Sequence, residues 1–248
     1  MGLNQRLFYL LFPALGGAGF LLRALQLRCG FEVDTGLAVA GYPAGGVLLL
    51  LAALLAALAL AAARVLPAAP PADGGRSALC PAAAAFLTAV MGFSLLAAGR
   101  GSHPAELLLG LAALATALHM FLAPRAAGGL RIFCAMETTL FYVVWLVVLF
   151  SRHATDPVLM GFWPPLLALC AAVFSCYFLA CAACGRPQPR RCLFSLLLGG
   201  SLALIAAADG CIPAPAPALW GFLAAALLQF GAAWAWLAPP KNIKNGNG

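Results

Sequence analysis

Eight long apolar runs constrain this chain more than any other feature. Lipid offers no hydrogen-bond partner to backbone polar groups, so a bilayer core of roughly 30 Å is crossed by about 20 apolar residues in helical form. The runs cover residues 7–25, 46–65, 81–98, 105–122, 132–150, 164–184, 192–208 and 219–237. The sequence therefore predicts an all-α fold, a polytopic integral membrane helical bundle with about eight transmembrane helices and short loops.

Composition supports lipid rather than water as the surrounding solvent. Of the 248 residues, 64% are hydrophobic and 8% are charged, whereas about 25% are charged in soluble domains. So few charged side chains cannot cover a soluble surface, which leaves apolar surface to face the bilayer. The net charge of +7 does not indicate nucleic-acid binding, because the basic residues stand singly or in small groups between apolar runs. We expect the lipid bilayer as the main partner and no nucleic acid.

The distribution of arginine and lysine predicts the orientation. If the N-terminus is cytoplasmic, ten basic residues fall on the cytoplasmic side and four on the other side. Positive charge resists translocation, so cytoplasmic loops carry the excess. The sequence predicts a multi-pass protein of the cell (plasma) membrane with both termini in the cytoplasm.

The chain is expected to form one domain. Residues 1–240 are predicted as a single transmembrane helical domain, and the polar residues 241–248 as a disordered C-terminal tail. The sixth helix is expected to begin at Pro164, because proline is tolerated in the first helical turn. A kinked helix that begins near Pro157 is the alternative.

The segment between the first two runs predicts a small extracytoplasmic hairpin. Apolar and acidic residues alternate over 31–34, and Thr35-Gly36 supplies a turn. Asp34-Thr35-Gly36 is also the tripeptide of aspartic proteases, but those enzymes need two carboxylates that share one proton. The tripeptide occurs once here, so we interpret the hairpin as a docking loop in which Glu32 and Asp34 form a small anionic patch.

One acidic residue lies inside an apolar run. An ionisable group near the bilayer centre costs roughly 2.5–3.5 kcal/mol or more, so Glu137 must face protein or water. Glu137 and His119 each lie six residues from a basic flank on consecutive antiparallel runs, hence at the same depth of about 9 Å. They are expected to meet, either as a proton-coupled site or as a polar clamp between two helices. The candidate intramembrane polar site comprises Glu137, His119, Thr138 and Tyr142.

Other motifs give weaker signals. Gly92-Phe93-Ser94 has a Gly-x-Ser form, but no later run combines a histidine with the rest of a serine-protease pattern, so it is interpreted as a small-residue packing face. Cys181 and Cys184 form one CxxC, although cysteine is also a small hydrophobe. We predict no catalytic residue, no metal and no cofactor.

Two classes of function compete. Scarce polar groups and abundant small residues favour a membrane-embedded partner or assembly subunit, in contact with other membrane protein subunits. The alternative is a transporter or channel for a small or lipophilic solute that uses the buried Glu137. An enzyme is the least favoured class, because the sequence shows no catalytic constellation.

Overall fold

The computed structural model describes residues 3–32, 39, 42–66, 68–69, 79–98, 104–153, 162–212 and 215–237. Within these residues the chain forms α-helices and no strand. The helices are α1 (Leu3–Cys29), α2 (Ala44–Val65), α3 (Leu79–Ala98), α4 (Pro104–Leu122), α5 (Gly128–His153), α6 (Trp163–Ala183), α7 (Pro189–Ala207) and α8 (Pro217–Leu237). All eight are long and apolar enough to cross a membrane. The all-helical fold with eight such helices is confirmed.

The helix ends lie within four residues of the predicted runs. α6 begins at Trp163 with Pro164 and Pro165 in its first turn, where a missing backbone donor costs nothing. The expected start at Pro164 is therefore right to within one residue. α1 and α5 extend further than their apolar runs, because both continue through flanking polar residues before they end.

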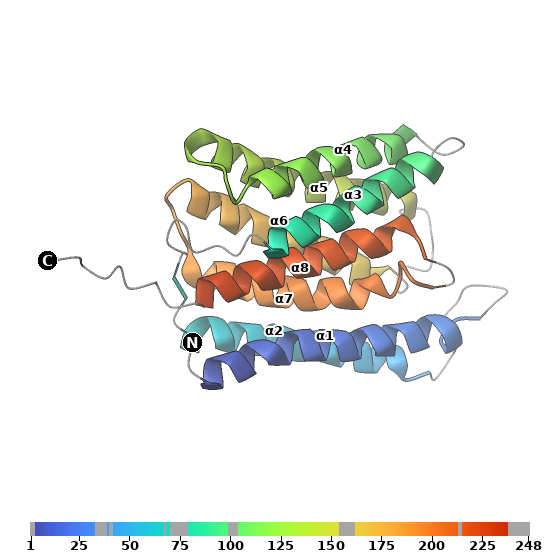
Figure 1. The fold of residues 1–248 in the computed structure, drawn as a ribbon. Coiled ribbons are helices and arrows are strands. Elements are labelled where there is room, and N and C mark those ends of the chain that lie inside the picture. Colours follow the sequence, from blue (N-terminus) through green and yellow to red (C-terminus); the bar gives the residue numbers. More distant parts are fainter. Residues whose placement is uncertain are drawn as a thin grey trace, which may run out of the picture.

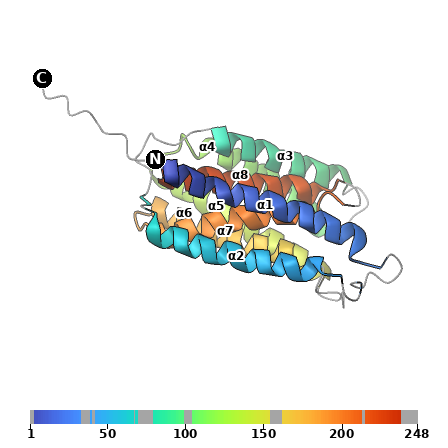
Figure 2. The same cartoon turned by 90° about the horizontal axis from the view of Figure 1, so that it is seen from below.

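Helices α3 to α8 form a closed ring in chain order. Each packs against the next, and α8 packs against α3. α7 also contacts α1 and α2, which lie outside the ring as a pair (Figure 1). The axes run roughly side by side in both views (Figure 2). Because four helices surround α7, 72% of its most apolar window is buried, against 22–44% for the other seven helices.

Small residues allow the closest helix contacts. On α1, a Cβ added at Gly16 would lie 3.2 Å from the Ser201 backbone of α7. On α3, a Cβ added at Gly92 would lie 2.9 Å from the Gly110 carbonyl oxygen of α4. Backbones that approach this closely exclude larger side chains. The interpretation of Gly92 as part of a packing face is confirmed.

Alternating helix directions define two ends of the bundle. We call the end where α1 begins and α8 finishes the N-terminal end (Figure 1), and the other the opposite end. At the opposite end, α1 is followed by a backbone hydrogen bond of 2.9 Å from Val39 N to Gly30 O. The rest of the expected hairpin, including Asp34, lies outside the described residues, as does the tail 241–248.

Candidate functional site

Glu137 lies on α5 at the contact between α4 and α5. Its Oε2 is 3.0 Å from Nδ1 of His119 on α4, and its Oε1 accepts a hydrogen bond of 2.7 Å from Thr116 Oγ. The Phe133 ring meets the His119 imidazole edge to face, with centroids 5.2 Å apart. The structure thus brings Glu137 and His119 together and adds Thr116, three residues before His119 on the same helix.

This polar cluster is a close charged contact without a hydrogen bond between its two titratable groups. Nδ1 of His119 and Oε2 of Glu137 lie 3.0 Å apart, within reach of an ion pair, but neither atom has a hydrogen-bond partner among the described residues. Thr116 Oγ is also 2.9 Å from the Ala112 carbonyl, and its single proton serves one acceptor at a time. The side chains of His119 and Glu137 are 21% and 18% exposed, so the cluster lies at the edge of the contact between α4 and α5.

Thr138 and Tyr142, the other members of the predicted site, lie on a different face of α5. The Thr138 hydroxyl donates to the Cys134 carbonyl at 2.9 Å. Tyr142 is buried and stacks on Trp145, with centroids 6.3 Å apart and planes inclined by 23°. Both face the interior of the ring, whereas Glu137 faces α4. Glu32, in the segment predicted as a docking loop, is exposed after α1, and its anionic patch with Asp34 stays a prediction.

A cavity of about 580 Å³ lies between the ring helices at the N-terminal end. α3, α4, α5, α6 and α8 line it, and Tyr9 of α1 contributes from outside the ring. α5 presents Arg131, Cys134, Ala135 and Thr138 to it, which are spaced by three or four residues and so share one helix face. The described lining is otherwise dominated by apolar side chains and includes no carboxylate. Such a cavity suits a molecule that is mainly apolar.

A second charged pair lies near the opposite end of the bundle. Arg23 of α1 is fully buried, and its guanidinium bonds both carboxylate oxygens of Asp209, at 2.6 and 3.1 Å. Arg23 also donates to Gln26 Oε1 at 2.8 Å. Burial raises the pKa of the Asp209 carboxyl, and the hydrogen bonds and charge of Arg23 act against this rise. This ion pair joins α1 to Asp209, the second residue after the end of α7.

Sequence reasoning missed this pair although a signal was present. Arg23 was counted as a flank of the first run, yet it lies two residues inside that run. Asp209 immediately follows the seventh run. The depth argument that matched Glu137 with His119 would also have matched these two residues. The cavity had no such signal, because it depends on how the ring closes.

The cysteines supply no metal centre in the described part of the chain. No group of three or more His, Cys, Asp or Glu side chains lies close enough there to hold a metal ion. Cys181, Cys184 and Cys192 form no disulfide among the described residues. Cys192 is buried and belongs to the hydrophobic core, as expected of cysteine used as a small apolar side chain.

The fold and these sites define a class, a bundle of eight helices able to span a membrane with a polar cluster and an apolar cavity. No known protein family, curated protein or solved structure matches the chain.

Proposed function

We propose that the protein is a multi-pass protein of the cell membrane that binds and carries a small lipophilic solute. The single observation that supports this function is the cavity between the ring helices. Ligand sites are concave, mostly apolar and about 300–1,000 Å³ in volume, with a few polar groups that orient the ligand. In this cavity Arg131 and Thr138 are such groups. They favour a solute with an apolar body and one polar or anionic end.

The charges of the two ends support a cytoplasmic N-terminal end. At the opposite end, Arg23 pairs with Asp209 and Arg152 pairs with Glu106. At the N-terminal end, Arg64, Arg186 and Arg190 are exposed. The N-terminal end therefore exceeds the opposite end in unpaired positive charge by more than a count of basic residues indicates. Segments rich in positive charge stay on the cytoplasmic side of the membrane. On this orientation the solute cavity lies in the cytoplasmic half.

The proposed solute site differs from the predicted transport site in its residues. Transport was expected to use Glu137, but Glu137 is not among the residues that line the cavity. It lies one position before Thr138, on the neighbouring face of α5. We therefore assign solute contact to Arg131 and Thr138, and we assign to Glu137 and His119 the clamp that fixes α5 against α4.

A partner subunit remains a second candidate, favoured by one observation. His119 and Glu137 keep about a fifth of their side-chain surface exposed, at a depth where lipid cannot hydrogen-bond to them. A helix of another membrane protein with a polar side chain would cover this surface. Co-purification of one defined membrane protein, lost in Glu137→Gln but kept when the cavity is filled, would favour this candidate.

A filled cavity tests solute binding directly. Ala232→Phe places a ring into the cavity lining, and Ala115→Phe adds the same group to an exposed position on α4. The proteins are purified in detergent and melted with a panel of lipophilic acids, alcohols and quinones. A ligand at 100 times its Kd stabilises by about 2.7 kcal/mol, so the melting temperature of the native protein and of Ala115→Phe should rise by several degrees.

In Ala232→Phe the same ligands should give no shift. The proposal fails if no compound stabilises the native protein, or if both variants respond equally. Native mass spectrometry of the native protein, without added compounds, provides a second readout, because a bound solute should be retained by the native protein and absent from Ala232→Phe.

A further inference from the structure

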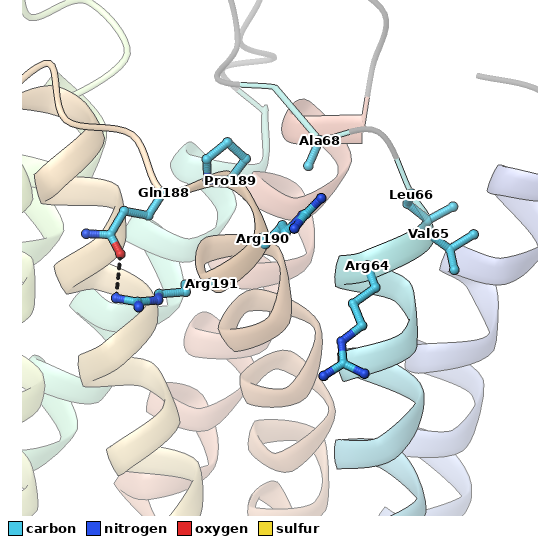
Figure 3. A pocket seen from close by; sticks show the side chains of 8 residues that line it. All are labelled: Arg64, Val65, Leu66, Ala68, Gln188, Pro189, Arg190 and Arg191. Carbon is cyan, nitrogen blue, oxygen red and sulfur yellow. Dashed lines mark hydrogen bonds between the residues drawn. The ribbon is translucent and has the colours of Figure 1, made fainter.

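A second pocket, separate from the solute cavity, opens at the N-terminal end between α2 and α7. Its volume is about 580 Å³. Three arginines line it, together with Gln188 and the apolar residues that end α2 and begin α7. Figure 3 shows Arg64 and Arg190 pointing into the space between the two helices from opposite sides. Arg191 points away from that space and donates a 3.0 Å hydrogen bond to Gln188 Oε1.

The positive charge in this pocket is not balanced by the described residues around it. No carboxylate is among the described residues that line it. Neither Arg64 nor Arg190 forms an ion pair or hydrogen bond with the described residues. The two guanidinium groups therefore face one space without a counter-charge from the described residues, which favours an anion between them.

The electrostatics at the start of α7 also favour an anion in this pocket. Arg190 and Arg191 lie in its first turn, where the helix dipole disfavours cations. Gln188, at the N-cap, forms no side-chain capping bond, so it does not satisfy the backbone donors of the first turn, which stay available to an anion. An anion bound here would interact with both arginines and donors, and it would offset the unfavourable placement of the cations.

The position of Arg64 indicates where the anion comes from. Arg64 is exposed and continues the outward stripe of α2 formed by Leu50, Ala57, Leu60 and Ala61. Leu50 and Leu60 are 71% and 44% exposed, as expected of side chains that face acyl chains. Arg64 lies one residue before the end of α2. Its charge is therefore at the depth of the lipid headgroups. Basic pockets between helices on the cytoplasmic side are suited to anionic lipid headgroups.

We propose that Arg64 and Arg190 bind the phosphate of an anionic membrane lipid, whose acyl chains lie along the outward face of α2. The recognised chemistry is a phosphate group with net negative charge joined to an apolar tail. The site is independent of the solute cavity, because the two sets of lining residues have no member in common. The lipid would fasten the outer pair, α1 and α2, to the ring at its cytoplasmic edge.

Lipid titration followed by native mass spectrometry tests the proposal. The detergent-purified protein is titrated with phosphatidylglycerol, with phosphatidylcholine, and with inorganic phosphate. Phosphatidylglycerol should bind at least tenfold more tightly than phosphatidylcholine. Each basic side chain at an anionic membrane surface contributes about 1 kcal/mol, so the pair Arg64→Gln and Arg190→Gln should weaken phosphatidylglycerol binding roughly 30-fold.

Two matched variants separate this site from general effects. Arg186→Gln removes the same charge from an exposed residue of the same end that does not line the pocket, and it should weaken binding by no more than about twofold because solvent ions screen it. The pair Arg64→Lys and Arg190→Lys keeps the charge and should retain binding within a few-fold of the native protein. All variants should melt within a few degrees of the native protein.

Several results would overturn the proposal. Equal losses in Arg186→Gln and in the glutamine pair would indicate general surface charge. Equal losses in the lysine and glutamine pairs would indicate packing rather than charge. Equal binding of phosphatidylcholine would remove the role of net charge. Inorganic phosphate that binds alone at millimolar concentration and displaces phosphatidylglycerol would identify a soluble phosphate as the ligand instead of a lipid.

Discussion

The contact between α1 and α7 and the contact between α4 and α5 each contain one charged pair, but the two regions pack differently. At the first, Arg23 is fully buried and held by both oxygens of Asp209. At the second, His119 and Glu137 meet through a single atom pair and keep about a fifth of their surface exposed. Loss of the carboxylate should therefore cost more at the first contact, because the Arg23 guanidinium itself has no access to solvent.

The difference follows from the position of α7. Four helices surround it, so a side chain of α1 that points towards α7 is removed from lipid and water alike. α5 packs mainly on α4 and α6, with Trp145 also touching Phe222 of α8, and the side of α5 that carries Glu137 stays partly open. A charge near α7 is thus suited to a fixed structural role. A charge at the edge of α4 and α5 stays partly exposed to its surroundings.

Removal of the Asp209 carboxylate should have the largest effect. Asp209→Asn removes the carboxylate that holds the fully buried Arg23 guanidinium through both of its oxygens. Breaking a buried pair in this way costs about 3–5 kcal/mol, and we expect the lower end because Asp209 is 18% exposed. Reversible denaturation of the purified protein in mixed micelles measures the loss in the free energy of unfolding.

Two companion variants test the cause. Replacing both partners, Arg23→Met with Asp209→Asn, should recover most of the lost stability, because no unpaired charge stays buried. Arg28→Gln removes an exposed charge near the same end and should change stability by less than about 0.5 kcal/mol. If the double replacement were as unstable as Asp209→Asn alone, the buried charge would not be the cause.

Two glycines on α1 test how closely α1 packs on α7. Their substitution should give the next largest effect. A Cβ at Gly19 would lie 2.6 Å from the fully buried Ile205 side chain of α7, whereas a Cβ at Gly17 would meet nothing within 4 Å. Gly19→Ala should destabilise by about 1–3 kcal/mol through overpacking. Gly17→Ala should stabilise by about 0.5–1 kcal/mol, because alanine restricts the unfolded chain.

The same denaturation assay compares the two glycine variants. They share a helix and differ by two positions, so helix propensity cancels between them. Equal stabilities would mean that α1 does not pack tightly on α7. The comparison between the two contacts would then lose its basis.

The sequence predicts the helices well, because a membrane-spanning helix is defined by a local property: a run of about 20 mostly apolar residues with few charges. It also predicts that Glu137 meets His119, since depth along antiparallel helices can be counted in residues. It does not show that α8 returns to α3, because these two runs are almost entirely apolar and carry no residue pattern that identifies the neighbouring helix. The cavity and the lipid pocket depend on that closure and were therefore not predicted.

The membership of the polar cluster was predicted only in part, with two residues wrongly included and Thr116 missed. Thr138 and Tyr142 were grouped with Glu137 because they are near it in sequence, yet residues one and five positions further along a helix point about 100° and about 140° away from it. Thr116 lies three residues before His119 and so shares its side of α4. A rule of helical spacing, applied before adjacency, would have selected Thr116 and placed Thr138 on the ring interior.

The coupling between Glu137 and His119 should be the smallest effect and completes the comparison. In a double-mutant cycle with Glu137→Gln and His119→Asn, we expect a coupling energy of about 0.5–1 kcal/mol, below that of Arg23 and Asp209. Glutamine can still accept from Thr116, and the open side of α5 lets the surroundings adjust. A coupling energy above about 3 kcal/mol would place this pair in the same class as the buried one. The α4 and α5 contact would then be as rigid as the contact with α7, and its exposed edge would have to be covered by another chain.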